Sequence, residues 1–153
     1  MTRTRALRRS ARVLLFDDHG RLLLIRRTRP TGETYLTTPG GGVGPDETWE
    51  VAAVRECAEE LGAEVLIGSV AWAGRLALPD QDSEQRFFTA RLVGLDDQRR
   101  TGPEFSEPWR GTYETLRVSL DDPALDEFRP AELVAMLRER GGQLAREAAT
   151  LVG

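Results

Sequence analysis

The spacing of apolar and polar positions along the chain predicts several short strands. Two apolar runs, residues 12–16 and 21–27, flank a polar turn that ends in Gly20, a pattern typical of a β-hairpin. Strand-like composition predicts four further strands, over residues 35–38, 65–78, 85–95 and 115–120. A turn rich in Pro and Asp separates the two long strands, so we expect these two to pair antiparallel.

A helical pattern replaces the strands between residues 47 and 61, where Glu, Ala, Arg and Leu dominate and Gly62 occupies the C-cap position. At about 100° per residue this segment has two faces. We expect one face to pack on the core through Val51, Val54, Ala58 and Leu61. The opposite face carries Glu56, Glu59 and Glu60.

The C-terminal residues predict a helix from Pro130 to about Arg140 that Gly141 closes, followed by a short helix over residues 143–151. A length of 153 residues fits one domain, residues 1–153, in which residues 1–11 are a basic arm or the beginning of the first strand. The apolar runs are far shorter than the roughly 18 residues of a membrane helix. We therefore expect no association with a membrane.

Residue types that are missing exclude several kinds of chemistry. All 21 basic residues are arginines, so no lysine can form a Schiff base, anchor pyridoxal phosphate or complete a phosphate-binding loop. The single histidine is His19, in the predicted hairpin turn, and the single cysteine is Cys57. One chain therefore cannot build a zinc site from Cys and His, a disulfide or a CxxC pair, and carboxylates must bind any metal.

Charge is distributed unevenly along the chain, because residues 1–30 are strongly basic whereas the formal charge of the whole is -4. A basic segment can bind nucleic acid or anionic phosphates. Residues 1–12 contain no RNA-binding motif and no interleaved aromatic residues, so we interpret them as a solvated arm or an arginine-rich strand rather than a nucleic-acid site. No apolar secretory segment follows, and we expect a cytoplasmic protein, either a monomer or a homodimer.

The three glutamates of the predicted helix lie at positions i, i+3 and i+4, where like charges repel by a few tenths of a kcal/mol per pair. A hard divalent cation such as Mg²⁺ would neutralise them, since it prefers a few carboxylates together with water and substrate phosphates. An acidic face exposed to solvent is the alternative. The glutamates by themselves leave both interpretations open.

The residues around these glutamates follow a longer fixed pattern. It consists of Gly41, five residues, Glu47, seven residues, Arg55-Glu56, two residues, Glu59-Glu60, one residue and Gly62. This spacing is the signature of the Nudix hydrolases, and the sequence resembles that family in its order of elements from about residue 10 to residue 140. The resemblance implies an α+β fold, an α/β/α sandwich in which a mixed β-sheet lies between helices.

By this resemblance, Glu56, Glu59 and Glu60 are ligands of Mg²⁺, with Mn²⁺ as a substitute, and Gly41 adds a backbone carbonyl oxygen. Arg55 orients Glu56 through an ion pair, and Glu47 stabilises the loop and helix. The base that activates water is Glu56 in our first interpretation. Glu104 and Glu107, on the polar loop of residues 98–111, are the alternatives.

Three further positions are interpreted beside the motif. Arg26 and Arg27 end the second predicted strand and are candidates for binding substrate phosphate, with a plain surface role as the alternative. Cys57 fills an apolar position of the motif, which favours a packing role over that of a nucleophile. Leu36 stands where similar sequences often carry an aromatic residue, which argues against base stacking there.

The implied function is Mg²⁺-dependent hydrolysis of a phosphoanhydride bond in a nucleoside diphosphate linked to another moiety. Because the chain is short, a (deoxy)nucleoside triphosphate that releases pyrophosphate, as in enzymes of the MutT type, is the favoured substrate. The alternatives are ADP-ribose, a nucleotide sugar, or a catalytically inactive nucleotide-binding module on the same fold. A prenyl diphosphate isomerase would require a Cys and His set that this chain lacks.

Overall fold

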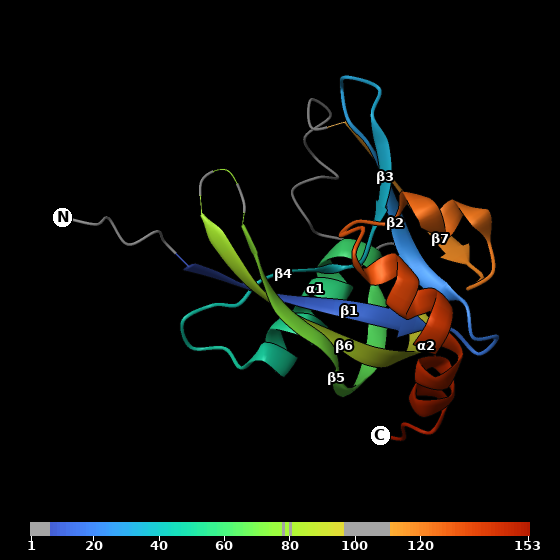
Figure 1. Cartoon of the computed structure of the whole chain (residues 1–153). Helices are drawn as coiled ribbons and strands as arrows, with labels where there is room; N and C mark the ends of the chain where they lie inside the picture. Colours follow the sequence, from blue (N-terminus) through green and yellow to red (C-terminus); the bar gives the residue numbers. More distant parts are fainter. Residues whose placement is uncertain (1–6, 78, 80, 97–110) are drawn as a thin grey trace.

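A mixed sheet of seven strands with a helix against each face forms the framework of the described residues (Figure 1). The structure is a computed structural model that describes residues 7–77, 79, 81–96 and 111–153. The strands are β1 (Leu7–Phe16), β2 (Leu22–Thr28), β3 (Thr34–Thr37), β4 (Gly40–Gly42), β5 (Ala63–Ala77), β6 (Asp82–Leu95) and β7 (Thr112–Val118). The helices are α1 (Trp49–Leu61), the 3₁₀ helix η4 (Pro123–Glu127) and α2 (Leu133–Ala149).

The order of the strands is β3-β2-β1-β6-β5, with β4 paired to β1 and β7 paired to β2. β1 and β6 run parallel, while all other pairs are antiparallel, including the predicted β5–β6 pair. The prediction of an α+β fold with a mixed sheet is therefore confirmed. Residues 7–11 of the predicted arm belong to β1, whereas residues 1–6 lie outside the described part of the chain.

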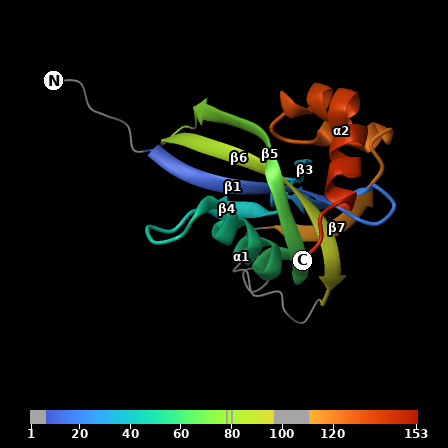
Figure 2. The same ribbon diagram turned by 90° about the horizontal axis from the view of Figure 1, so that it is seen from below.

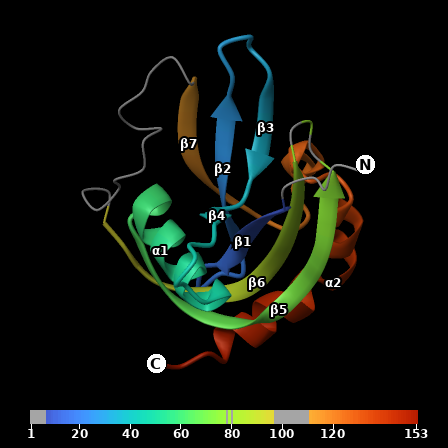
Figure 3. The same ribbon diagram turned by 90° about the vertical axis from the view of Figure 1, so that its left-hand side faces the viewer.

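The sheet is divided into two halves. β1 and β2 share only one paired position, Phe16 with Leu22, although they form the predicted hairpin. Beyond that pair, β1 continues beside β4 and β6, while β2 is flanked by β3 and β7. Figure 3 shows β2, β3 and β7 standing away from the curved strands β1, β6 and β5. The two halves of the sheet therefore diverge beyond the Phe16–Leu22 pair.

Alternation along the central strands separates two hydrophobic layers. In β1, Val13 and Leu15 pack on the side of α1, whereas Leu14 and Phe16 pack on the side of α2. Figure 2 shows the two helices on opposite sides of the strands. No helix in the described part of the chain is long and apolar enough to cross a membrane.

The orientation of α1 differs from the prediction. Leu61 is buried as expected, but Val51 and Val54 are 53% and 42% exposed, and the buried positions are Ala52, Ala53, Cys57 and Leu61. The face that carries the glutamates therefore overlaps the face that packs on the sheet. The helical pattern assumed that carboxylates avoid the protein interior, whereas here small side chains bring the helix close to the sheet and the carboxylates find polar partners there.

The C-terminal helix also differs from the prediction of two helices separated at Gly141. A single helix, α2, continues through Gly141 and Gly142 to Ala149. Gly141 lies in its buried stripe, and a Cβ atom there would come within 2.8 Å of the Leu120 side chain. The glycine thus allows close packing of Leu120 against a continuous helix instead of ending it.

The turn between β1 and β2 is held by Asp17, whose side chain is 2% exposed. Its carboxylate accepts hydrogen bonds from the backbone N–H groups of His19 and Arg21 and from the guanidiniums of Arg21 (2.9 Å) and Arg117 (3.1 Å). Burial acts to raise the pKa of Asp17, but these N–H groups outweigh burial and hold the pKa below its ordinary value. Because Arg117 belongs to β7, one carboxylate connects the hairpin turn to a third strand.

We expect Asp17→Asn to lower the free energy of unfolding by about 2 kcal/mol at pH 7, because the amide leaves buried donors without an ionised acceptor. The pKa of Asp17 is lower in the folded state than in the unfolded state, so its contribution is complete above about pH 4 and is lost as the pH falls through the folded value. Urea unfolding of both proteins between pH 7 and pH 3 checks this. The difference in unfolding free energy between the wild type and Asp17→Asn should shrink below pH 4. The control Asp18→Asn, at an exposed position, should unfold like the wild type.

Candidate active site

The glycine-rich segment before α1 forms a short strand. Gly40–Gly42 form β4, which pairs with Ser10, Ala11 and Arg12 of β1. Gly40 has a φ of 144°, and a Cβ atom there would collide with the Ala11 carbonyl oxygen. Only glycine therefore allows this segment to lie so close to β1. At the other end of the motif, Gly62 caps α1 in the left-handed conformation, with a φ of 65°.

Arg55 joins the loop before α1 to the carboxylates of the helix. Its Nε and Nη2 atoms donate to the two carboxylate oxygens of Glu47 at 2.8 and 2.9 Å, and Nη2 also donates to the Gly42 carbonyl at 3.0 Å. Its Nη1 atom donates to Glu56 Oε1 at 3.0 Å and lies 3.3 Å from Glu59 Oε2. One guanidinium thus contacts three carboxylates.

The charges in this network affect one another. The hydrogen bonds from Arg55 and from the Gly44 N–H lower the pKa of Glu47 to about 2. The same ion pair with Glu47 raises the pKa of Arg55. Burial raises the pKa of Glu56, and Arg55 counteracts that effect. Glu47 therefore remains ionised at neutral pH, and Arg55 keeps a permanent positive charge beside Glu56.

Glu60 points away from Arg55 and toward the sheet. Its Oε2 atom accepts a hydrogen bond from the Gly40 N–H at 2.9 Å. The Gly40 carbonyl in turn accepts from Arg12 Nη1 at 3.0 Å, while Arg12 Nη2 donates to Thr37 Oγ1 and to the Thr38 carbonyl, each at 2.9 Å. Burial lowers the pKa of Arg12, an effect that Glu60 and Glu56 oppose. Arg12 thus links β1 to the residues that follow β3.

The donor types fit a hard divalent cation, although the three glutamates do not converge. Carboxylate oxygens of Glu56 and Glu59 lie together at Arg55 Nη1, and the absence of a side chain at Gly41 lets the Glu56 carboxylate lie against the backbone of β4. Over residues 7–77, 79, 81–96 and 111–153, no three His, Cys, Asp or Glu side chains are grouped as a metal site. This arrangement suits Mg²⁺, which binds one or two carboxylates and otherwise keeps water or substrate phosphate as ligands.

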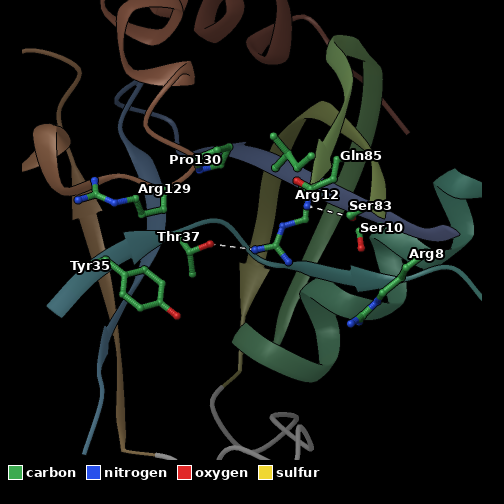
Figure 4. A pocket seen from close by; sticks show the side chains of 10 residues that line it. Arg8, Ser10, Arg12, Tyr35, Thr37, Ser83, Gln85, Arg129 and Pro130 are labelled. Atoms are coloured by element: carbon green, nitrogen blue, oxygen red, sulfur yellow. Dashed lines mark hydrogen bonds between the residues drawn. The ribbon is translucent and has the colours of Figure 1, made fainter. Parts of the chain in front are cut away.

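Two adjoining cavities lie between the halves of the sheet. The first, about 340 Å³, is lined by Glu60 together with Arg8, Arg12, Ile25, Arg27, Tyr35, Thr37, Thr38 and Tyr113. The second, about 450 Å³, shares four of these residues, Arg8, Arg12, Tyr35 and Thr37 (Figure 4). We call the first the Glu60 cavity. We call the second the Gln85 cavity, because Gln85 lies on its floor. Together they form one cleft that begins at the glutamate helix.

The other predicted site residues are separated by the structure. Arg27 lines the Glu60 cavity, where its Nη1 atom donates to the Tyr35 hydroxyl at 3.1 Å and its guanidinium lies 5.2 Å from the Tyr113 ring centroid. Arg26 points to the opposite face of β2 and pairs with Glu114 at 3.7 Å. Glu104 and Glu107 lie outside the described residues. Burial raises the pKa of the Cys57 thiol, in agreement with a packing role.

Arg8 and Arg12 line both cavities, and the sequence analysis did not identify them. The sequence did contain a signal for them. Arg8, Ser10 and Arg12 occupy every second position of β1 and therefore share one face, although the strand becomes apolar toward its C-terminal end. The sequence analysis also did not identify two buried polar atoms. Arg27 Nε and Thr38 Oγ1 have no hydrogen-bond partner within the part of the chain that the structure describes, and both residues line the Glu60 cavity.

The model of the NUDIX domain family matches residues 6–138 of this chain. The chain belongs to the Nudix hydrolase family. The RNA pyrophosphohydrolase of Pseudomonas fluorescens strain Pf-5 is 31% identical over 150 residues, which cover 80% of this chain and 91% of that protein. The RNA pyrophosphohydrolase of Gluconobacter oxydans is 30% identical over 114 residues, or 72% of this chain, and this chain spans 62% of that protein.

Solved structures show the same fold. A NUDIX hydrolase from Nitrosomonas europaea superposes with a TM-score of 0.72 at 17% identity, covering 97% of each chain. The MutT protein from Methanosarcina mazei Go1 gives a TM-score of 0.65 at 21% identity, covering 95% of this chain and 98% of that one. The predicted family is therefore confirmed. This Nudix hydrolase is a pyrophosphohydrolase that acts on nucleoside diphosphate derivatives, and its family uses divalent cations.

The contact between Gly41 and Glu56 predicts an unequal effect of two alanine substitutions. A Cβ atom at Gly41 would lie 2.6 Å from Glu56 Oε1, so Gly41→Ala should displace that carboxylate from Arg55. A Cβ atom at Gly42 meets only the flexible Arg8 side chain, at 3.5 Å. We expect Gly41→Ala to lower kcat/KM by about a hundredfold with little change in Tm, because the end of Glu56 can move without disturbing the core.

Gly42→Ala is the matched control and should stay within about threefold of the wild type in kcat/KM. Initial rates and thermal melts of both variants provide the measurement. Equal losses of activity in the two variants would contradict the role of the Gly41–Glu56 contact.

Proposed function

We propose that this Nudix hydrolase is a Mg²⁺-dependent enzyme that hydrolyses a (deoxy)nucleoside triphosphate to the monophosphate and pyrophosphate. The observation that carries the proposal is the Glu60 cavity, where Arg8, Arg12 and Arg27 line the same space as a glutamate of the motif. A triphosphate brings several negative charges, and guanidiniums bind phosphate oxygens in pairs of parallel hydrogen bonds. We further propose that residues 1–153 act as one domain in the cytoplasm, where such nucleotides occur.

The unpartnered atoms of the Glu60 cavity support a polar ligand. Arg27 Nε can donate only, and the Thr38 hydroxyl can donate or accept. A buried polar group without a partner costs about 1–3 kcal/mol, a cost that a ligand with phosphate or hydroxyl oxygens would remove. Tyr35 and Tyr113 fix the Arg27 guanidinium on either side, so that little freedom is lost when it binds phosphate.

For the reaction we assign roles to the residues of the motif. Glu56 and Glu59, with the Gly41 carbonyl and with Glu60 on the side of the cavity, are the ligands proposed for Mg²⁺ or for Mn²⁺ in its place. A bound cation supplies neutralisation of phosphate charge and acidification of a bound water. Arg55 positions Glu56 through the 3.0 Å ion pair, and Glu47 holds Arg55. Glu56 is the proposed base, with Glu104 and Glu107 as the alternatives.

A second candidate substrate is the 5′-triphosphate end of RNA. Two relatives that are 31% and 32% identical to this chain are named RNA pyrophosphohydrolase, and the chemistry at the phosphates would be the same. The exposed arginines at the beginning of β1 would meet the following nucleotides. ADP-ribose and nucleotide sugars are the remaining candidates.

The metal proposal predicts that EDTA abolishes turnover and that Mg²⁺ or Mn²⁺ restores it. Glu56→Gln should lower kcat by at least about a thousandfold, because the variant loses both a metal ligand and the proposed base. Glu50→Gln, an exposed position of the same helix, should retain wild-type activity. Full activity in EDTA, or a Glu56→Gln variant as active as Glu50→Gln, would refute the metal proposal. If Glu56→Gln still binds the metal and retains turnover, another residue is the base. The variants Glu104→Gln and Glu107→Gln, measured in the same assay, then show which of these two glutamates it is.

The substrate proposal predicts that Arg8→Ala raises KM for a nucleoside triphosphate by about tenfold, since one guanidinium is removed from the cleft. Arg9→Ala is the control, because Arg9 lies on the opposite face of β1 and lines neither cavity. The assay compares dNTPs and NTPs, a triphosphorylated RNA oligonucleotide and ADP-ribose, with pyrophosphate measured as the product of the triphosphates and AMP as the product of ADP-ribose. The highest kcat/KM on RNA would select the second candidate, and turnover of ADP-ribose alone would reject both.

A further inference from the structure

The floor of the Gln85 cavity is a polar patch that adjoins the apolar residues covered by α2. Ser83 and Gln85 of β6 precede Phe87 on the same face, and Phe87 is buried beneath α2. The same face of β1 also changes from polar to apolar along the strand, from Ser10 to Leu14. The helix α2 therefore covers only part of this face, and the uncovered part is the floor of the cavity.

Gln85 lines the cavity, and its neighbour in β1 is a small residue. Its paired position in β5 is Gly74, which has no side chain, and its paired position in β1 is Ser10. Figure 4 shows Gln85, Ser83 and Ser10 on one side of Arg12, with Tyr35 and Arg129 on the other. The Trp72 indole fills the space above Gly74, so the Gln85 side chain meets the cavity on the side of Ser10.

A hydrogen bond to a buried serine orients the Gln85 amide. Its Nε2 atom donates to Ser83 Oγ at 3.2 Å, and Ser83 is 1% exposed. Glutamine carries two amide N–H donors and one carbonyl acceptor. One N–H is used by Ser83, which leaves Oε1 and one N–H for a ligand.

This pair of groups matches one edge of adenine. A glutamine amide forms two hydrogen bonds with adenine, accepting from the N6 amino group and donating to N7. The cavity also has apolar walls for a flat ring, provided by Tyr35, Leu76 and Pro130. The Tyr35 ring is held in place by Arg27, which donates to its hydroxyl, and by Arg29, whose guanidinium lies 5.2 Å from its centroid.

We propose that Gln85 determines base specificity and that the preferred substrates carry adenine. This inference rests on the proposed function, since the phosphates must occupy the Glu60 cavity for the base to reach the Gln85 cavity. The two cavities share Arg8, Arg12, Tyr35 and Thr37, so a single nucleotide extends from one to the other. Hypoxanthine and guanine carry a carbonyl at the position of the adenine amino group and would face the Gln85 carbonyl oxygen with a second acceptor.

The kinetic test compares ATP, ITP and GTP as substrates of the full chain with Mg²⁺. We expect kcat/KM for ATP to exceed that for ITP by about tenfold or more, because the wrong base leaves buried polar groups unpaired. Gln85→Met, which keeps the length of the side chain, should reduce this ratio to within about twofold. Gln143→Met, at an exposed position of α2, should leave the ratio unchanged.

A binding measurement separates failure of this inference from failure of the proposed function. The side-chain amide resonance of Gln85, assigned by its loss in Gln85→Met, should shift when AMP is added and stay in place when inorganic phosphate or ribose 5-phosphate is added. An unchanged resonance with AMP, or an ATP preference that persists in a folded Gln85→Met, overturns the inference while turnover of triphosphates continues to support the function. A preference for ITP or GTP that Gln85→Met removes also overturns it, because the amide would then present its N–H groups. Absence of any triphosphate turnover, together with an unchanged resonance, rejects both.

Discussion

The guanidinium of Arg55 is the contact on which the glutamate helix depends. It binds the loop before α1 through Glu47 and the Gly42 carbonyl, and it binds the helix itself through Glu56 and Glu59. Charge-assisted hydrogen bonds of this kind are stronger than neutral ones, and the two bonds to Glu47 fix the plane of the guanidinium. The position of Glu56 therefore follows from the loop as much as from the helix.

The same network leaves an excess of negative charge. One guanidinium contacts three carboxylates, and Glu60 is held nearby by the Gly40 N–H. A positive counterpart beyond Arg55 would balance this charge, which is the physical reason why a divalent cation suits the site. The low pKa of Glu47, about 2, means that its carboxylate serves Arg55 and is not available as a proton acceptor at neutral pH.

Small residues bring these charges close to the sheet. The glycines of β4 pair directly with β1, and Ala52 and Ala53 form the inner side of α1. As a consequence, Glu56 and Glu60 lie against β4, whereas Glu59 stays partly exposed beside Arg55. Because β1 and β2 meet at only one pair, the two halves of the sheet diverge and the cleft opens beside the carboxylates. The close approach of α1 to the sheet therefore produces both the packing of the helix and the arrangement of the candidate active site.

Alternation along the chain determined most of the strands, and the spacing from Gly41 to Gly62 identified the family, because both are local properties of the sequence. The mixed sheet followed from the resemblance to that family. The sequence also placed Arg55 next to Glu56, but neighbours at i and i+1 of a helix do not face each other, so their ion pair depends on the loop that holds Arg55. The tertiary structure decided the rest. The outward side of α1, the continuity of α2 through Gly141 and the direction of Arg26 all depend on what lies opposite in space. The same holds for the cleft, since Arg8, Arg12, Tyr35 and Gln85 are far apart in sequence and share a cavity only because β1, β3 and β6 converge there.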